Sequence, residues 1–338
     1  MIEANIDLQP HNTLAISANT AFFARVETLD ELREALSFAQ QKRLPILPLG
    51  GGSNIVLTGD FPGLAIQVAL LGLTVTPSGR GGIIEAAAGE GWHQLVMSSV
   101  EQGMGGLENL ALIPGKVGAA PIQNIGAYGV ELCDCFCSLQ AMEISTGTLH
   151  NFSASDCEFD YRDSVFKGQL RDQYIITQVK LRLAQDWQPK VSYPALQQFI
   201  TEQGWDCDSL TPAQIATAVI DIRNSKLPLP DLIPNAGSFF KNPVVDADIY
   251  HSLKSEHPDL VAYASGEGWK LAAGWLIDRA GWRGRRHEAV GVHHQQALVL
   301  VNPGRGRGDE VTRLARAIAS DVQDKFGVTL EPEPRYYP

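Results

Sequence analysis

Apolar residues recur three and four positions apart in several stretches of the chain, and this period predicts helices. The first helix begins at Thr28, where Glu31 completes a capping box, and runs to about residue 41. Another begins at Thr211, with Pro212 at the first helical position, and reaches about residue 224. The other predicted helices cover residues 92–102, 268–280 and 309–325.

Shorter apolar runs that end at Gly, Pro or polar residues predict strands. They lie at residues 45–49, 55–57, 63–69, 83–88, 174–183 and 297–301. A chain of 338 residues exceeds one ordinary core, so two or three domains are expected. Residues 72–82 are rich in Gly, Pro and Ser and predict a change of unit, and residues 227–230 predict an interdomain linker.

The composition excludes several classes of protein. At 44% hydrophobic and 19% charged residues the chain is typical of globular proteins. Its net charge of −11 argues against general nucleic-acid binding. No apolar run reaches the length of a membrane span, and the N-terminus lacks the basic and apolar regions of a secretory signal. We therefore expect a cytoplasmic protein with no membrane or nucleic-acid partner.

Five cysteines are an odd number for a disulfide framework, which favours reduced thiols. Cys133, Cys135 and Cys137 alternate along the chain, so on a strand they would share one face. Their spacing differs from the Cys-x-x-Cys of common zinc sites. We predict buried strand thiols and no metal site.

Two glycine-rich stretches are candidates for a cofactor site. The first, Gly50-Gly51-Gly52-Ser53-Asn54, lies between two predicted strands. Its backbone N–H groups could wrap a phosphate, or it could be a flexible connection. It matches neither the dinucleotide fingerprint nor the P-loop.

The second stretch, residues 113–129, contains four glycines and two prolines and yet is apolar. It cannot form a continuous helix or strand, and a solvated linker would be more polar. We expect its backbone to press against a flat, largely apolar ligand, whose polar edge would bond to Gln123 and Asn124.

Residues 235–243 read Asn-Ala-Gly-Ser-Phe-Phe-Lys-Asn-Pro and form the strongest candidate for chemistry. Gly237 permits an unusual φ, which would place Ser238 on a tight loop beside an apolar wall of two phenylalanines. The segment lacks the second glycine of a Gly-x-Ser-x-Gly nucleophile elbow. Ser238 could therefore be a nucleophile, a proton donor or a turn residue.

Other candidates lie far from Ser238 in the sequence. Arg162 follows Tyr161 and suits either a surface ion pair or a substrate carboxylate. Tyr193 lies on an irregular stretch, either as a cap on the core or as a lid contact. In the tail, Glu331 and Glu333 alternate between prolines, and the flanking apolar residues favour docking over exposure.

The chain resembles the UDP-N-acetylenolpyruvoylglucosamine reductase family, flavoenzymes of peptidoglycan synthesis. Four separated motifs carry the resemblance, and they occur in the family's order over essentially the whole chain. They are Leu49-Gly50-Gly51-Gly52-Ser53-Asn54, the stretch 113–129, residues 235–243, and Leu330-Glu331-Pro332-Glu333. Pro334 departs from the pattern, because an aliphatic residue is expected there.

The resemblance implies an α+β fold of the vanillyl-alcohol-oxidase (PCMH) type, with two FAD-binding subdomains and a C-terminal α+β substrate-binding domain. We place these parts at residues 1–70, 71–222 and 223–338. The resemblance also implies which residues contact FAD. They are Gly50, Gly51, Gly52, Ser53, Asn54, Pro114, Gly115, Gly118, Gln123, Asn124, Gly126, Ala127 and Tyr128.

The family reaction implies that NADPH reduces FAD and that hydride then passes to C3 of UDP-N-acetylglucosamine enolpyruvate. By resemblance Ser238 donates a proton to C2, Arg162 holds the carboxylate on which charge accumulates, and Glu333 shares a proton with that carboxylate. Substrate binding is implied for Tyr193, Lys226, Asn242 and Gln296. Tyr193 also suits the family's longer, type I branch.

Two other readings remain. An oxidase on the same fold would pass flavin electrons to O₂, and many such enzymes tether FAD through His or Cys near the first loop, where residues 50–57 have neither. A non-catalytic sugar-nucleotide-binding protein would need no flavin loop and no proton donor. We expect a monomeric enzyme with a small-molecule substrate.

Overall fold

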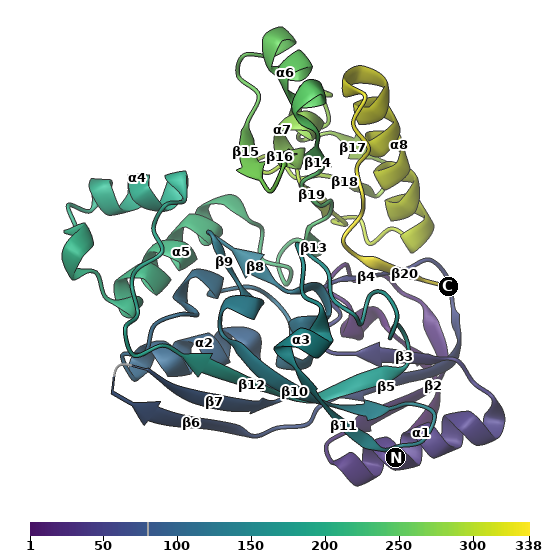
Figure 1. Cartoon of the computed structure of the whole chain (residues 1–338). Coiled ribbons are helices and arrows are strands. Elements are labelled where there is room, and N and C mark those ends of the chain that lie inside the picture. Colours follow the sequence, from purple (N-terminus) through teal and green to yellow (C-terminus); the bar gives the residue numbers. More distant parts are fainter. Residues whose placement is uncertain (80) are drawn as a thin grey trace. The chain divides into compact units, whose positions relative to one another are not determined.

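The computed structural model describes residues 1–79 and 81–338, and these divide into two units, each with its own sheets (Figure 1). Unit 1 comprises Met1–Ile6, Thr20–Gly51 and Pro62–Ser225, and unit 2 comprises Asp7–Asn19, Gly52–Phe61 and Lys226–Pro338. The finer division of residues 1–222 at residue 70 stays a prediction.

The first sheet of unit 1 has four strands and is covered by one helix. Its strand order is β1 (Ile2–Asp7), β2 (Asn19–Val26), β5 (Phe61–Val68), β3 (Ile46–Leu49). The helix, α1 (Leu29–Lys42), begins at the predicted capping box: Thr28 accepts from the N–H of Glu31, and the Glu31 carboxylate accepts from the N–H of Thr28. Its buried face packs Leu32 and Leu36 against Leu64 and Ile66 of β5.

The second sheet of unit 1 is antiparallel and has five strands. Its order is β11 (Leu149–Ser153), β10 (Phe136–Glu143), β12 (Tyr174–Leu183), β7 (Gly81–Ala87), β6 (Leu73–Ser78). Buried side chains of this sheet share a core with α2 and α5. The helices of this part are α2 (Trp92–Glu101), α3 (Ala154–Cys157), α4 (Pro194–Glu202) and α5 (Pro212–Lys226), with a 3-10 turn, η6 (Cys207–Ser209).

The second glycine-rich stretch has no long regular element, as predicted. It consists of short 3-10 turns followed by a two-residue hairpin. Within residues 113–129 these are η3 (Val117–Ala119), η4 (Pro121–Gln123) and the first hairpin strand, β8 (Gly126–Ala127). The stretch is preceded by η2 (Glu108–Leu110) and followed by the second hairpin strand, β9 (Val130–Glu131), and by η5 (Leu132–Asp134). The prediction of three strand thiols is wrong, because Cys133 lies in η5 and Cys135 ends that turn, and only Cys137 belongs to a strand.

Unit 2 contains two small sheets and one parallel strand pair. The first sheet has the order β13 (Asn235–Ser238), β19 (Val299–Val301), β18 (Val290–Val292), β17 (Arg286–His287), with α8 (Gly308–Phe326) beside it. The second has the order β14 (Val244–Val245), β16 (Gly268–Leu271), β15 (Ala262–Ser265), with α6 (Ala247–Glu256) and α7 (Ala273–Arg279). The pair joins β20 (Arg335–Tyr337) to β4 (Ile55–Leu57), and η1 (Gln9–His11) completes the unit.

One predicted helix, at residues 268–280, is wrong in its first half. Residues 268–271 form β16, which pairs with β15 on one side and β14 on the other. A Cβ on Gly268 would lie 2.6 Å from the carbonyl oxygen of Val245, so this close strand contact requires glycine. The helix, α7, begins only at Ala273. Helices α4 and α6 are further elements that the apolar period did not reveal.

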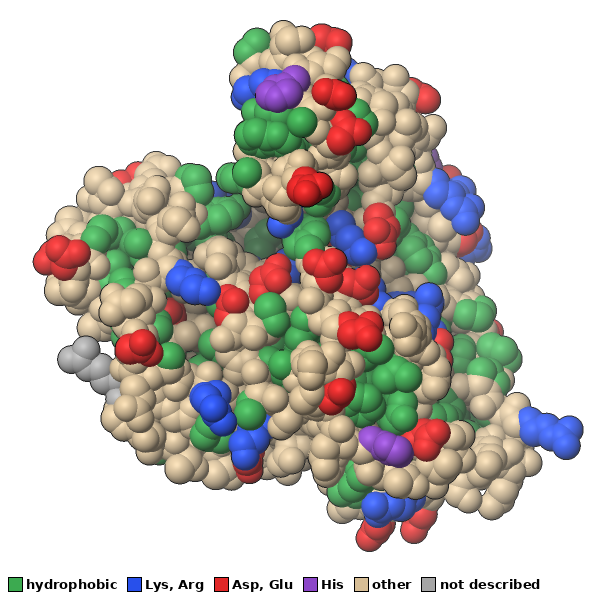
Figure 2. Space-filling model, viewed as in Figure 1, with side chains coloured by type: hydrophobic (Ala, Val, Ile, Leu, Met, Phe, Trp, Pro, Cys, Tyr) green, Lys and Arg blue, Asp and Glu red, His purple; other side chains and the backbone are tan. Residues whose placement is uncertain are grey.

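The surface agrees with the net negative charge. On the face shown in Figure 2, Lys and Arg side chains are interspersed with Asp and Glu and do not gather into one basic area. Among the described residues, no helix combines the length and the apolar character that crossing a membrane requires.

Candidate active site

The two glycine-rich stretches predicted to hold FAD meet within unit 1. A Cβ added to Gly51 would lie 3.3 Å from the Cα of Gly115, and one added to Gly118 would lie 2.6 Å from the Cβ of Ala88. The backbone therefore approaches at distances that side chains would prevent. Hydrogen bonds fix the second stretch, since Gly115 accepts from Trp92 N and Gly118 donates to Ala88 O. Such bare backbone is what a cradle for a flat cofactor requires.

Arg162 is tied to the second glycine-rich stretch. Its guanidinium donates to the carbonyl of Gly126 (2.5 Å) and more weakly to that of Asn124 (3.4 Å). Arg162 itself has a φ of +55°, at the tip of a tight turn between Asp160 and Asp163. A positive φ at a residue other than glycine is costly, and such strain gathers at functional positions.

The Asn124 side chain is used inside the protein. Its amide donates to Glu131 Oε2 (2.8 Å) and to the carbonyl of Asp160 (3.2 Å), and it accepts from Cys133 N (3.0 Å). The residue is fully buried. The Asn124 side chain thus holds the turn together inside the protein, and its contact with a cofactor stays a prediction. Gln123 is half-buried and lies at the end of η4.

Tyr128 and Tyr193, predicted to contact cofactor and substrate respectively, lie against each other. Their ring centroids are 5.1 Å apart in an edge-to-face arrangement. Tyr128 has a φ of +50° and Gly129 a φ of +81°, which is the signature of a tight two-residue hairpin turn between β8 and β9. Tyr193 precedes the first residue of α4 and is partly exposed, at 39%.

Arg223, in the last turn of α5, is a functional candidate that the sequence reasoning missed. Its Nε is buried and has no hydrogen-bond partner in the described chain. Burial lowers the pKa of its guanidinium, Tyr128 opposes the shift, and Arg162 adds to it. Arg162, Arg223 and Tyr128 thus form a cationic cluster, which favours an anionic ligand. The available signal was an arginine following Val219 at helical spacing on an apolar helix face.

In unit 2, Ser238 ends β13 at a bulge. Gly237 has a φ of +68°, as predicted, and the register of β13 against β19 shifts between Asn235 and Ser238. The Asn235 side chain holds the bulge: it accepts from Gly237 N (2.8 Å) and donates to Ile233 O (2.8 Å) and Pro228 O (3.1 Å). Ser238 is exposed, so its hydroxyl is accessible to a reactant.

The tail docks beside Ser238. The N–H of Glu333 donates to Phe239 O, the N–H of Lys241 donates to Glu331 O, and the Lys241 ammonium forms an ion pair with the Glu331 carboxylate at 2.6 Å. Pro334 does not weaken this docking, because alternate residues make the bonds: Glu333 and Arg335 donate their N–H groups, and Pro334 lies between them. Asn54 reaches the same tail through Glu333 O.

Two of the predicted substrate-binding residues meet at one helix. Asn242 accepts from the N–H of Ala273 (2.9 Å), the first residue of α7. The Gln296 amide oxygen lies 3.2 Å from where a Cβ on Gly274 would be. Lys226 is exposed at the end of α5. Of the catalytic candidates, Ser238 and Glu333 belong to unit 2 and Arg162 to unit 1.

Comparison with known proteins gives two family matches. A model for the FAD binding domain matches residues 20–153, and a model for the C-terminal domain of UDP-N-acetylenolpyruvoylglucosamine reductase matches residues 228–337. Together with the glycine-lined backbone, they define a FAD-binding oxidoreductase.

The relatives extend over the whole chain. A UDP-N-acetylenolpyruvoylglucosamine reductase of Paraburkholderia xenovorans is 50% identical over 333 residues, which is 98% of this chain and 96% of that protein. One of Pseudomonas fluorescens is 46% identical over 338 residues, with 99% of each covered. The chain belongs to the UDP-N-acetylenolpyruvoylglucosamine reductase family.

Solved structures agree with the expected fold class. The UDP-N-acetylenolpyruvylglucosamine reductase of Thermus caldophilus matches with a TM-score of 0.69 at 25% identity, over 100% of this chain and 99% of that one. A 6-hydroxy-D-nicotine oxidase of Arthrobacter nicotinovorans matches with a TM-score of 0.53 at 12% identity, over 97% and 86%, and shares the fold. The prediction of an α+β, PCMH-type FAD-binding fold is confirmed, with the family's C-terminal domain following it.

Proposed function

We propose that the protein reduces UDP-N-acetylglucosamine enolpyruvate to UDP-N-acetylmuramate at the expense of NADPH, in the synthesis of peptidoglycan precursors. The observation that carries the proposal is the close approach of Gly51 to Gly115 in unit 1, in a chain that belongs to the UDP-N-acetylenolpyruvoylglucosamine reductase family. When bound, FAD accepts hydride from NADPH and supplies it to C3 of the enolpyruvyl group. We further propose a monomeric, cytoplasmic enzyme.

The glycine-rich backbone would hold the cofactor. A Cβ at Gly50, Gly51 or Gly118 would lie 3.2, 3.3 or 2.6 Å from Lys116, Gly115 or Ala88, so glycine lets these backbone segments approach closely. Gly126 is fixed by its bond to Arg162. We assign the remaining predicted contacts, through Gly52, Ser53, Asn54, Pro114, Gln123, Asn124, Ala127 and Tyr128, to the same cofactor.

The cationic cluster of unit 1 would bind the anionic reactants. Arg162 is our candidate for the enolpyruvyl carboxylate, where negative charge grows as hydride arrives at C3. A guanidinium that is already in place and half-buried stabilises such charge more than a solvated one. Arg223 supplies a second positive charge to this cluster, and Tyr193 sits at its edge through Tyr128.

In unit 2, Ser238 is our candidate for the proton donor to C2 and Glu333 for the group that shares a proton with the carboxylate. The support is local: the N–H of Glu333 bonds to Phe239, the residue after Ser238, so one short segment positions both side chains. Lys226, Asn242 and Gln296 would bind the diphosphate of the substrate or the reductant.

The test is an anaerobic absorption spectrum of the purified holoprotein, with one equivalent of NADPH added first and one of the enolpyruvyl substrate second. We expect the flavin bands to bleach with NADPH and to return with the substrate. Bands that return only in air would point to an oxidase. A protein that binds no FAD on reconstitution would contradict the whole assignment.

A further inference from the structure

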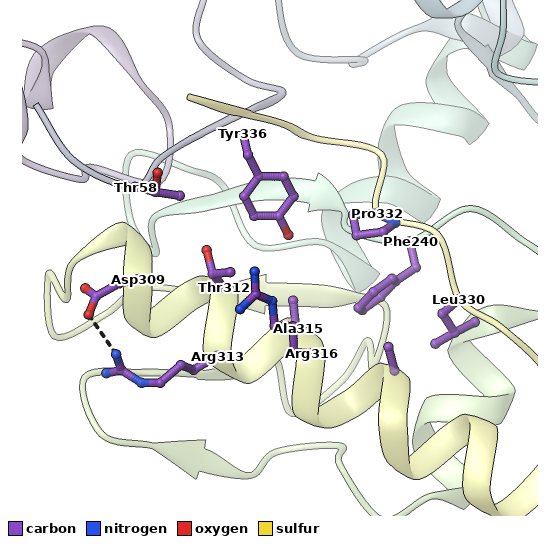
Figure 3. Close-up of a pocket in the computed structure, with 11 residues that line it drawn as sticks. Thr58, Phe240, Asp309, Thr312, Arg313, Ala315, Arg316, Leu330, Pro332 and Tyr336 are labelled. Atoms are coloured by element: carbon purple, nitrogen blue, oxygen red, sulfur yellow. Dashed lines mark hydrogen bonds and ion pairs between the residues drawn. The ribbon is translucent and has the colours of Figure 1, made fainter. Parts of the chain in front are cut away.

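An open-sided cavity of about 750 Å³ lies within unit 2, between α8 and the tail (Figure 3). This volume is in the range of small-molecule sites. None of the predicted site residues lines it. The cavity exists because the lining residues of α8 include small ones, Thr312, Ala315 and Ala319, where a packed interface would carry larger side chains.

The cavity has an apolar part and a polar part. Phe240, Leu330 and Pro332 form apolar walls, and Phe240 and Leu330 are almost completely buried. At the other side, the ring of Tyr336 extends from the tail toward α8 and lies near Arg316 (Figure 3). Burial raises the pKa of the Tyr336 phenol to about 12, against the influence of Arg316, so the hydroxyl stays a hydrogen-bond donor at neutral pH.

The two arginines at the polar side differ in their partners. Arg313 is neutralised by ion pairs with Asp309 (2.7 Å) and Glu288 (3.0 Å). Arg316 has neither an ion pair nor a hydrogen bond among the described residues, and its guanidinium is exposed at the cavity. The cavity therefore presents one uncompensated positive charge and one hydroxyl donor next to an apolar wall.

We propose that this cavity is a second binding site, which takes a small amphipathic anion with an aromatic or aliphatic body and a single carboxylate. The apolar body would lie against Phe240, Leu330 and Ala319, and the carboxylate would meet Arg316 and Tyr336. A diphosphate or sugar nucleotide does not fit this description. Arg313 is already paired with Asp309, which lies on the same wall, so Arg316 alone among the described lining residues would face its two or more negative charges.

The walls of the cavity connect it to the proposed chemistry. Phe240 and Pro332 form a β-bridge, and the bonds on either side of it hold Lys241 to Glu331 and Glu333 to Phe239. A ligand against Phe240 and Pro332 thus presses on the segment that carries Ser238 and Glu333. We infer that occupancy changes the rate of enolpyruvyl reduction, an inference that rests on the proposed function.

Binding is tested by calorimetry on the full-length FAD-loaded protein, with biphenyl-4-carboxylate as the probe and biphenyl-4-carboxamide as its uncharged match. We expect the carboxylate to bind at least tenfold more tightly, and the substitution Arg316→Gln to abolish that difference. Equal affinity of the two probes, or an unchanged Kd for Arg316→Gln, overturns the site.

A second variant tests whether the probe binds in the cavity. Ala319→Leu fills the space from the helix side and should weaken carboxylate binding at least tenfold without loss of thermal stability. Saturating enolpyruvyl substrate should leave the probe's Kd unchanged, whereas competition would place the probe in the substrate site and overturn the proposal. If Ala319→Leu lowers stability, Ala319→Val replaces it, and wild-type affinity in the variant contradicts the site.

A separate experiment tests whether a ligand in the cavity changes the rate of enolpyruvyl reduction. In stopped-flow experiments on reduced enzyme, saturating biphenyl-4-carboxylate should change the rate of flavin reoxidation by the enolpyruvyl substrate at least twofold in the wild type and not in Ala319→Leu. An unchanged rate with the probe bound overturns the coupling. Failure of the proposed function is distinguishable, because it would appear without any probe.

Discussion

The backbone N–H of Glu333 donates to the carbonyl oxygen of Phe239, 2.9 Å away, and so fastens the tail one residue beyond Ser238. Two candidate proton-handling side chains, 95 positions apart in the numbering, thereby depend on one piece of backbone. A change at either side chain should alter chemistry, whereas a change to the backbone that carries them should alter chemistry and stability together.

We expect Ser238→Ala to separate the two half-reactions. The variant should bind FAD and be reduced by NADPH at wild-type rate, because no proton from Ser238 is needed there. Reoxidation by the enolpyruvyl substrate should slow by about 10²–10⁴-fold, the usual contribution of a positioned acid. Anaerobic stopped-flow absorbance measures both rates. Ser252→Ala, at an exposed position of α6, is the matched control, and near-normal reoxidation in Ser238→Ala would remove Ser238 from the mechanism.

Asn235→Ala should affect both stability and turnover. The substitution leaves the part-buried N–H of Gly237 and two carbonyls without this partner, at a cost of about 1–3 kcal/mol. The bulge that presents Ser238 should then relax and kcat should fall while FAD content stays constant. Urea unfolding and steady-state kinetics test this, with exposed Asn224→Ala as control. A stable variant with normal kcat would show that the bulge does not position Ser238.

Gly51→Val should impair cofactor binding in particular. The added Cβ lies 3.3 Å from the Cα of Gly115, and the branched methyl groups extend into the backbone cradle. We expect the Kd for FAD to rise at least tenfold, measured by flavin fluorescence on reconstitution, with an unchanged far-UV circular dichroism spectrum. The control is Gly59→Val, whose Cβ has its nearest neighbour at 3.7 Å. Equal FAD affinity of both variants would argue against the cradle.

Arg223→Met should increase stability and reduce function. A buried guanidinium without a hydrogen-bond partner at Nε destabilises the folded state unless a bound ligand compensates its charge. We expect the melting temperature to stay equal or rise, and the KM for the enolpyruvyl substrate or NADPH to increase at least tenfold. Arg182→Met, at an exposed strand position, should change neither. A clear loss of stability in Arg223→Met would instead indicate a structural role.

We expect protonation of His93 to lower the free energy of unfolding as the pH falls below about 6.5. Burial lowers its pKa and Arg223 lowers it further, while its Nδ1 accepts from the N–H of Leu112 at 3.1 Å. The unfolded chain therefore takes up a proton near pH 6.5, before the folded protein does, and stability declines as pH falls from 6.5 toward the lower folded value. Urea unfolding between pH 7.5 and about 5.5 should show a smaller decline for His93→Asn, which keeps an acceptor but does not titrate. An identical decline would assign the effect to other groups.

Features that depend on a few neighbouring residues could be predicted from the sequence. The capping box at Thr28, the strand at Tyr174–Leu183 and the positive φ of Gly237 follow from a few adjacent residues, and the structure has all three. The role of Asn124 did not follow, because its partner Asp160 lies 36 residues away and only the folded chain brings them together. Helix 268–280 failed for the same reason, since pairing with β14 and β15 overrides the apolar period of Leu271 and Trp275.

Arg223 and the cavity beside α8 belong to a different category. No sequence motif marks them. Arg223 is notable because its Nε has no hydrogen-bond partner in the described chain, and the cavity exists because small side chains of α8 leave space unfilled. Site residues that a shared motif carries, such as Ser238, can be assigned from sequence. Sites defined by what is absent around a side chain appear only once its neighbours are known.

The pairing of β20 with β4 has a consequence for the order in which the chain acquires its structure. Thr58, just after β4, bonds to Tyr337, 279 residues later, and the segments Asp7–Asn19 and Gly52–Phe61 of unit 2 are made before most of unit 1. During synthesis those early segments lack their contacts in unit 2 until almost all the remaining chain has been made. All residues of unit 1 precede residue 226, so unit 1 can fold during synthesis. Unit 2 needs contacts between segments far apart in the chain, which form slowly, and it completes last. The residues of β4 therefore remain without their partner strand until the end of the chain is made.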